Sequence, residues 1–191
     1  MPNNIIYNLF SKDEIESIKN ILFLKESEIL LDEPQLGRNR FVIPITLIKK
    51  QIIKKVYDQA KIFLKSPILV DCQYSEYNLK YGNPELSVHT DTRLSTFTID
   101  YQLDSNCIWP IYVEGKPFSL ENNQALTINV NEQAHWRPKR KFSEGEYVKM
   151  IFFHFNDLSG KKPKILNANE QEKLRSKWNH LWDLEFGNNN I

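Results

Sequence analysis

The sequence predicts an α+β protein in which a helical N-terminal part packs on a β-sandwich or barrel of about eight strands. Two observations lead to this fold class. Apolar residues recur at helical spacing within residues 1–66, whereas residues 67–157 contain short runs of β-branched and aromatic residues. Gly, Pro, Asn and Asp separate these runs, as in strands joined by turns. A chain of 191 residues suits one compact domain, so we expect residues 1–191 to form a single domain.

The first expected helix lies in FSKDEIESIKNILF, residues 10–23. Ser11 is a favourable N-cap residue, and Glu14 follows three positions later, so the pair has the pattern of a capping box. One face of this helix would be apolar, formed by Ile15, Ile18 and Leu22. The pattern therefore predicts a helix that begins at Ser11 and buries that face.

Two further helices are expected, one on each side of the β-rich region. The stretch LIKKQIIKKVYDQAKIFLK, residues 47–65, combines an apolar stripe with a lysine-rich face. The stretch NANEQEKLRSKWNHLWDLEF, residues 167–186, has Asn167 or Asn169 as its N-cap. Between the first two helices, LDEPQLGRNRF (residues 31–41) contains a proline and a glycine and is expected to be a loop.

Eight strands are expected in the middle of the chain, each a short run bounded by turn residues. One pair should form a hairpin, because Glu114-Gly115 supplies a turn between two such runs. The eight runs are ILVDCQYSEYNLKY (68–81), ELSVHTD (85–91), STFTIDYQL (95–103), WPIYVEG (109–115), KPFSL (116–120), QALTINV (124–130), AHWRP (134–138) and YVKMIFFHF (147–155).

The charge balance excludes several classes of partner. The net charge is +1, with 26% charged and 41% hydrophobic residues, so no global field favours nucleic acid or an anionic membrane. No apolar run reaches the roughly 20 residues that span a bilayer, and MPNNIIYNLF lacks the pattern of a signal peptide. We therefore expect a cytoplasmic protein that binds neither nucleic acid nor membrane, and whose substrate is a small molecule.

The stretch LSVHTDTRLS, residues 86–95, places His89 and Asp91 one residue apart in an expected strand. Side chains alternate between the two faces of a strand, so this imidazole and this carboxylate lie on the same face. They could occupy two neighbouring positions on a metal ion. The spacing alone is a weak signal, because a polar strand edge would have the same pattern.

A third ligand must come from another histidine. His180 lies in the expected C-terminal helix, and His154 lies in an apolar strand, where a core role is favoured. His135 follows at a strand edge after enough chain for two hairpins, so it is the best candidate. Two histidines and one carboxylate leave about three positions of the metal open, which is the arrangement of non-haem Fe(II) oxygenases.

The stretches YNLKYGNPELSVHTD, STFTIDYQLD and WPIYVEGKPFSLENNQALTINVNEQAHWRP together resemble 2-oxoglutarate- and Fe(II)-dependent oxygenases of the prolyl 4-hydroxylase type. The resemblance covers roughly residues 70–157. It implies a double-stranded β-helix (jelly-roll) core with the helices packed on it. It also implies Fe(II) held by His89, Asp91 and His135, with 2-oxoglutarate and O2 as co-substrates. Because Asp91 fills the carboxylate position, the resemblance implies hydroxylation or a related C–H oxidation.

The resemblance also requires a cation for the far carboxylate of 2-oxoglutarate. Lys149 stands at the family's usual distance beyond His135, and Arg137 is its rival because it lies two residues after His135. Tyr77 and Tyr81 precede the HxD strand and could donate hydroxyl hydrogen bonds to the co-substrate. The basic residues near Arg137 would suit an acidic or carboxylate-bearing substrate.

Other residues near these positions have weaker assignments. Arg93 follows Asp91 and could reach the mouth of the pocket, and Asp100 could act as a partner of the ligands. Trp109 and Trp136 could line the site, although a core position is favoured for both.

Two other functions stay open at this stage. The first is a cupin-like metal enzyme that does not use 2-oxoglutarate, although such sites more often combine three histidines with a glutamate. The second is a non-catalytic β-sandwich binding module, in which His89 and Asp91 would be an incidental surface pair. The substrate expected for the oxygenase is an amino acid or a short peptide.

Overall fold

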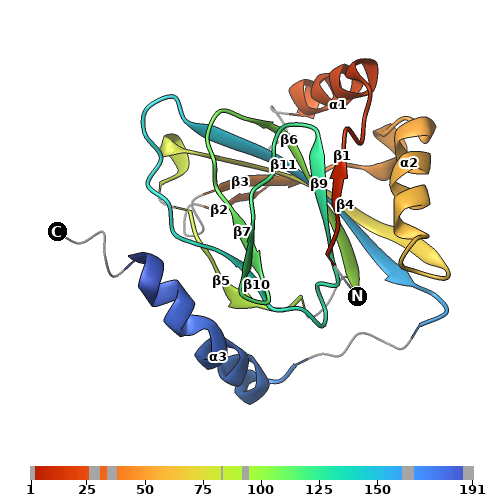
Figure 1. Ribbon diagram of the computed structural model, residues 1–191. Helices are drawn as coiled ribbons and strands as arrows, with labels where there is room; N and C mark the ends of the chain where they lie inside the picture. Colours follow the sequence, from red (N-terminus) through yellow and green to blue (C-terminus); the bar gives the residue numbers. More distant parts are fainter. Residues whose placement is uncertain are drawn as a thin grey trace.

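The computed structural model describes residues 3–25, 31–33, 38–82, 84–91, 95–160 and 166–186 (Figure 1). Two antiparallel sheets face each other in it. The larger sheet has the order β1 (Ile5–Tyr7), β9 (Gln124–Ile128), β6 (Phe97–Ser105), β11 (Tyr147–Asp157), β4 (Pro67–Asn78), β3 (Arg38–Val42) and β2 (Leu31–Glu33). The smaller sheet has the order β5 (Leu86–His89), β10 (His135–Arg137), β7 (Ile111–Val113) and β8 (Lys116–Phe118).

All eight strands predicted from the sequence are present, as β4 to β11. The hairpin β7–β8 turns at Glu114 and Gly115, whose φ angles of 48° and 78° are those of a tight hairpin turn. The prediction of a loop over residues 31–41 is wrong at both ends, because β2 forms the edge of the larger sheet there and β3 pairs between β2 and β4. Residues 34–37 lie outside the described residues.

Three α-helices surround the sheets: α1 (Lys12–Lys25), α2 (Lys50–Ala60) and α3 (Ala168–Phe186). The capping box forms, since the Ser11 amide donates to Glu14 Oε2 at 2.7 Å and the Glu14 amide donates to Ser11 Oγ at 3.4 Å. The second helix is shorter than predicted, because residues 45–47 form a separate 3-10 turn before it. None of the described helices is long and apolar enough to cross a membrane.

The helices cover the outer faces of the two sheets (Figure 1). α1 and α2 pack on the larger sheet, where Ile18, Ile52 and Val56 join one apolar cluster with the strand residues below them. α3 packs on the smaller sheet through Leu174 and Trp178. The described helices therefore cover the outer face of each sheet. The inner faces of the two sheets lie opposite each other.

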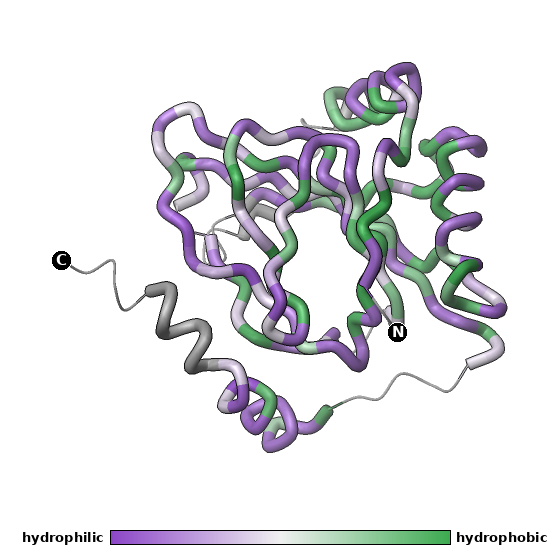
Figure 2. The backbone as a smooth tube through the Cα atoms, viewed as in Figure 1, coloured by the Kyte–Doolittle hydropathy of each residue, from purple (hydrophilic) through white to green (hydrophobic). Residues whose placement is uncertain are grey.

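Side-chain alternation along β11 shows how that inner space is divided. Ile151, Phe153 and Phe155 point to the helices, whereas Phe152 and His154 point to the smaller sheet. Hydrophilic residues are interspersed with hydrophobic ones along the strands, rather than confined to loops (Figure 2). The inner face of the larger sheet is partly polar, since Ser75, Asp100 and His154 lie on it, which a purely structural sandwich core would avoid.

Candidate active site

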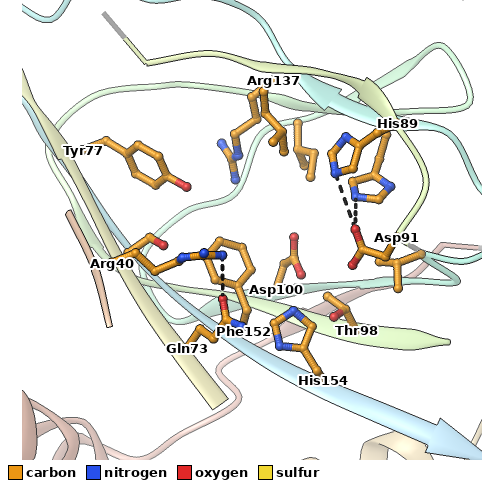
Figure 3. A pocket seen from close by; sticks show the side chains of 15 residues that line it. Arg40, Gln73, Tyr77, His89, Asp91, Thr98, Asp100, Arg137, Phe152 and His154 are labelled. Carbon is orange, nitrogen blue, oxygen red and sulfur yellow. Dashed lines mark hydrogen bonds and ion pairs between the residues drawn. The ribbon is translucent and has the colours of Figure 1, made fainter. Parts of the chain in front are cut away.

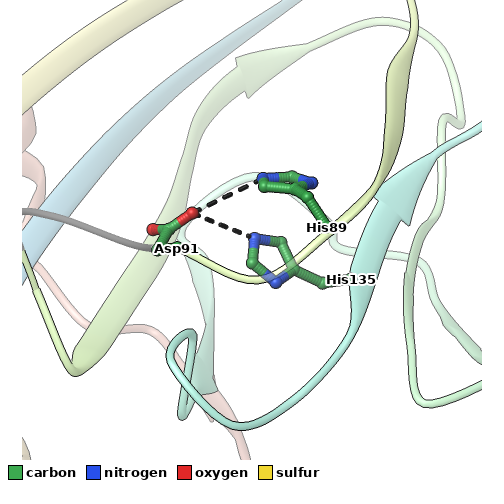
Figure 4. A group of neighbouring side chains, drawn as sticks. All are labelled: His89, Asp91 and His135. Carbon is green, nitrogen blue, oxygen red and sulfur yellow. Dashed lines mark ion pairs between the residues drawn. The ribbon is translucent and has the colours of Figure 1, made fainter. Parts of the chain in front are cut away.

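The smaller sheet brings the three predicted ligands together. His89 ends β5 and His135 begins β10, and the two residues are direct partners in the antiparallel pair. Asp91 follows β5 and is held by its backbone amide, which donates to the Val130 carbonyl at 2.7 Å. One donor atom from each of the three side chains lies within 4.8 Å of the others (Figure 4). Strand pairing thus brings together His89 and His135, which are 46 positions apart in sequence.

Both histidines direct Nε2 toward the place where the three side chains meet. Nδ1 of His89 lies 2.7 Å from the Ser87 carbonyl, and Nδ1 of His135 lies 3.1 Å from the Gln133 carbonyl. A carbonyl oxygen can only accept a hydrogen bond. Each Nδ1 therefore carries the hydrogen, and each Nε2 has a free lone pair. The Nε2 atoms lie 3.4 Å and 3.6 Å from Asp91 Oδ1.

The protonation of the cluster suits a metal ion. Burial raises the pKa of Asp91, but the interactions with His89 and His135 outweigh this effect and lower the pKa to about 2. Burial, assisted by His89, lowers the pKa of His135 to about 4. At neutral pH the site therefore offers an ionised carboxylate and a neutral imidazole, which is the form in which both groups bind metals.

The cluster opens into a cavity of about 280 Å³ between the sheets (Figure 3). The larger sheet forms one wall and the smaller sheet the other. Apart from the three ligands, its lining residues are Arg40, Gln73, Ser75, Tyr77, Leu86, Thr98, Asp100, Ile111, Val130, Arg137, Phe152 and His154. The cavity thus adjoins the candidate metal site and carries polar, charged and apolar groups.

Arg137 is one of two arginines among the described residues that line this cavity. It is 2% exposed, and its Nη1 donates to the Trp109 carbonyl at 2.5 Å while its guanidinium lies 4.8 Å from the Trp109 ring. Burial lowers its pKa from the ordinary value, and Tyr77 and Asp100 oppose this shift. Tyr77 lies near it on β4 with its hydroxyl directed into the cavity (Figure 3).

Lys149 and Tyr81 are not brought to the cavity. Lys149 lies on the helix-facing side of β11, in a separate depression with Leu103 and Asp104, and its Nζ lies 5.3 Å from the Tyr147 ring centroid. The hydroxyl of Tyr81 accepts a hydrogen bond from Asn39 Nδ2 at 3.3 Å, in the 3-10 turn after β4. Strand alternation explains the first case, because the inward positions beside Lys149 are Val148 and Met150.

Three polar residues of the larger sheet line the cavity wall opposite the smaller sheet. Asp100, with 4% of its surface exposed, and Thr98, with 2%, lie on β6, and His154 lies across from Thr98 on β11. Burial raises the pKa of Asp100 to about 8, although the charge of Arg137 opposes the shift. His154, for which a core role is favoured by sequence, instead lines the cavity. We call Thr98, Asp100 and His154 the floor cluster.

Arg40 was not found from the sequence. It lies on β3, and its Nη1 donates to Gln73 Oε1 at 3.1 Å. Gln73 in turn donates to Asp71, whose Oδ2 lies 3.6 Å from His154 Nδ1. The alternation in RNRFV, which predicts that Arg40 and Phe41 lie on opposite faces of a strand, is the signal that could have revealed it.

The remaining candidates have mostly structural positions. Trp109 belongs to the core between the sheets, and its indole donates to the Pro138 carbonyl at 2.8 Å. Trp136 points away from the cavity and packs against Trp178 of α3. His180 lies in α3. Arg93 lies outside the described residues.

Comparisons with known proteins identify solved structures that have a similar fold. No protein-family model matches the sequence, and no curated protein matches it. Solved structures do match. EctD from S. alaskensis in its apo form has a TM-score of 0.64 at 12% identity, covering 87% of this chain and 77% of that chain. HygX from Streptomyces hygroscopicus, with nickel and 2-oxoglutarate bound, has a TM-score of 0.61 at 12% identity, covering 91% and 89%.

A third similar structure is the viral collagen prolyl hydroxylase vCPH from Paramecium Bursaria Chlorella virus-1, as a 2-oxoglutarate complex. Its TM-score is 0.59 at 10% identity, covering 82% of this chain and 96% of that chain. At these identities the likeness establishes the fold. The predicted α+β fold, a double-stranded β-helix core with helices packed on it, is therefore confirmed.

The donor set also fits a metal ion on the chemistry of its own residues. Two imidazole Nε2 atoms with fixed tautomers and one ionised carboxylate converge from one side, and a cavity adjoins them. Ligands gathered on one side leave further positions of the ion free for other molecules. The arrangement can therefore hold a divalent metal and present it to a bound ligand.

Proposed function

We propose that this protein is a non-haem Fe(II)/2-oxoglutarate-dependent dioxygenase that hydroxylates a small molecule, such as an amino acid or a short peptide. In the reaction, O2 provides one oxygen atom to the substrate C–H bond and one to 2-oxoglutarate, which loses CO2 and becomes succinate. The observation that carries the proposal is the convergence of His89, Asp91 and His135 beside a cavity that is lined by polar and apolar groups. The iron would supply the site at which O2 is activated.

The chain's own residues would do the rest of the work. The carbonyls of Ser87 and Gln133 fix the two imidazole rings, so the ligands need little rearrangement to bind the metal. Arg137 would bind the far carboxylate of 2-oxoglutarate, because its planar guanidinium can pair with both oxygens and it lies buried in the cavity. Tyr77 would add a hydroxyl hydrogen bond.

A small substrate is supported by the size of the cavity and by one similar structure. A volume of about 280 Å³ is at the lower end of pockets for small molecules. HygX, whose structure matches with a TM-score of 0.61, has been solved with hygromycin B bound. The two arginines in the cavity support a substrate that carries a carboxylate.

The test is succinate formation by the purified protein with Fe(II), 2-oxoglutarate and O2. We expect succinate at a slow rate without substrate, and no succinate from His135→Ala protein. A folded protein that binds Fe(II) but neither binds nor consumes 2-oxoglutarate would favour the cupin-like alternative. A folded protein that binds no metal would favour the non-catalytic binding module.

A further inference from the structure

The floor cluster contains buried polar atoms that lack a hydrogen bond among the described residues. Thr98 and Asp100 are 2% and 4% exposed, and Thr98 Oγ1, Asp100 Oδ1 and His154 Nδ1 are buried without a partner. Nδ1 of His154 lies 3.6 Å from Asp71 Oδ2, which is too far for a hydrogen bond. All three residues of the cluster line the cavity (Figure 3). Because buried polar groups are nearly always hydrogen-bonded, these atoms indicate that a group of a bound molecule completes them.

The floor cluster is uncharged at neutral pH. Burial raises the pKa of Asp100 to about 8, so most of this carboxyl group keeps its proton at pH 7. Burial lowers the pKa of His154, so its imidazole is neutral, and the hydroxyl of Thr98 carries no charge. The cluster therefore supplies no counter-charge of its own, and an ionised ligand group is a poor match for it.

Each group of the floor cluster can both donate and accept a hydrogen bond. This holds for a hydroxyl, for a protonated carboxyl and for a neutral imidazole, which donates from one nitrogen and accepts at the other. An ammonium group only donates and a carboxylate only accepts, so either would use half of what the cluster offers. The matching ligand group is neutral and does both, which leaves a hydroxyl or a carboxamide.

The spacing of Thr98 and Asp100 favours the carboxamide. The two residues share a face of β6, and their side chains stand about 6.6 Å apart at the usual rise of a strand. A single hydroxyl oxygen with hydrogen bonds of about 2.8 Å connects groups that are at most about 5.6 Å apart. The oxygen and nitrogen of a carboxamide are separated by about 2.2 Å, so their hydrogen bonds span up to about 8 Å. Only the carboxamide reaches both residues.

We propose that Thr98 and Asp100 are specificity-determining residues that bind a carboxamide of the substrate, which is therefore asparagine or glutamine, free or within a short peptide. The nitrogen of the carboxamide would donate to Asp100 Oδ1, and its oxygen would accept from the hydroxyl of Thr98. Phe152 is the cross-strand partner of Asp100 and also lines the cavity, so it would contact the methylene groups next to the carboxamide. This inference rests on the proposed function and names its substrate class.

The first experiment measures binding without turnover. Calorimetry under anaerobic conditions would use full-length protein loaded with Mn(II) and 2-oxoglutarate. The ligands are asparagine, glutamine and the tripeptides that carry either residue between two glycines. Aspartate and glutamate replace the carboxamide by a carboxylate of the same shape, and leucine and homoleucine replace it by a hydrocarbon group. We expect each replacement to weaken binding by about 10- to 100-fold, because the polar atoms of the floor cluster lose their partners.

Three variants assign the contacts. Thr98→Val and Asp100→Leu should each reduce the preference for the carboxamide over the hydrocarbon group by about 10-fold, because each removes one hydrogen-bonding group. Asp100→Asn should keep that preference, since the asparagine side chain is also uncharged and both donates and accepts. Circular dichroism checks that all three variants fold.

Two matched controls lie on the same strand and on its neighbour. Asp104→Asn changes a carboxyl of β6 in the depression on the helix-facing side, and Thr127→Val removes a buried hydroxyl that accepts a hydrogen bond from the Asn4 amide. Both controls should retain the preference for the carboxamide.

The best carboxamide ligand should also stimulate succinate formation above the substrate-free rate. If 2-oxoglutarate binds and is slowly consumed but no carboxamide binds, the inference is wrong and the proposed function stands. Equal binding of leucine and asparagine would mean that water alone satisfies the floor cluster, and tighter binding of aspartate would mean that it takes an anion. Either result overturns the inference. If the protein neither binds 2-oxoglutarate nor forms succinate, both proposals are wrong.

Discussion

The two sheets that enclose the cavity treat their polar side chains differently. On the smaller sheet, His89, His135 and Arg137 each donate to a backbone carbonyl, so their orientation is fixed before any ligand arrives. On the larger sheet, Thr98 Oγ1 and Asp100 Oδ1 are buried without a hydrogen bond among the described residues. A polar group that makes a hydrogen bond is held in one orientation, whereas a buried polar group without one still lacks a partner. Under the proposed function, the smaller sheet would hold the metal and the 2-oxoglutarate, and the larger sheet would offer its remaining polar groups to a substrate.

The largest effect should come from the metal ligands. Asp91→Ala or His135→Ala removes one of three donors, and we expect metal affinity to fall by more than about 100-fold, since even the partners of metal ligands contribute about 10- to 100-fold. Metal content and anaerobic calorimetry with Mn(II) measure it. His154→Ala is the matched control, because His154 lines the same cavity but is outside the donor cluster. Loss of metal from the His154 variant would contradict the division between the sheets.

Next in size is the co-substrate contact. Arg137→Gln should weaken 2-oxoglutarate binding by about 10- to 100-fold, because a buried charged hydrogen bond is lost. Lys149→Gln should leave it unchanged, since Lys149 lies on the other face of the larger sheet. Calorimetry with Mn(II)-loaded protein gives the affinity, and circular dichroism checks that Arg137→Gln still folds. If Lys149→Gln weakened 2-oxoglutarate binding and Arg137→Gln did not, Lys149 would be the residue that binds the co-substrate.

A third prediction concerns the stability of the larger sheet. Asp100 has a folded-state pKa of about 8, well above its ordinary value of 3.8, because burial disfavours the charged form. Between these values the unfolded chain releases a proton that the folded chain keeps, so stability decreases as pH rises. Asp100→Asn removes this dependence, and its stability relative to the original protein should grow between about pH 4 and pH 8, reaching on the order of 1–3 kcal/mol.

Denaturant unfolding of the ligand-free protein at several pH values measures this difference. Asp104→Asn serves as the control, as a half-exposed carboxylate on the same strand. A constant difference across that pH range would show that Asp100 is not buried in the way that the structure indicates.

The sequence was sufficient to select the three side chains that the structure brings together, because their signal is local. His89 and Asp91 share a strand face by alternation alone, and His135 was the histidine at a strand edge after two hairpins. Lys149 could not be assigned in this way. YVKMIFFHF is apolar on both faces, so its periodicity does not tell which face looks inward. The pairing of β11 with β4 and β6 decides it, and those contacts are far apart in sequence.

Arg40 was missed for a related reason. Its strand, β3, directly follows residues 34–37, whose proline and glycine predict a loop. Tertiary pairing with β4 overrides that local preference and brings the arginine to the cavity. The eight central strands were predictable because each has strong β-forming residues and clear turns. Which of their side chains face the cavity depends on strand register, and composition does not encode register.

The smallest effect gives the most direct comparison of satisfied and unsatisfied groups. Thr98 and Thr127 are both buried, at 2% and 1% exposure, on neighbouring strands. Thr127 Oγ1 accepts from the Asn4 amide at 3.0 Å, whereas Thr98 Oγ1 has no partner among the described residues. Valine has nearly the same shape, so Thr127→Val should destabilise the protein by about 1 kcal/mol through the lost hydrogen bond.

Thr98→Val, by contrast, should be neutral or stabilising by up to about 1 kcal/mol, because it removes a hydroxyl whose burial is uncompensated. The free energy of unfolding of both variants, measured in denaturant without ligands, tests this. Equal destabilisation by the two substitutions would mean that Thr98 is already satisfied in the ligand-free protein. Opposite signs would mean that the larger sheet gives up stability to keep polar groups available for a substrate, as functional sites commonly do.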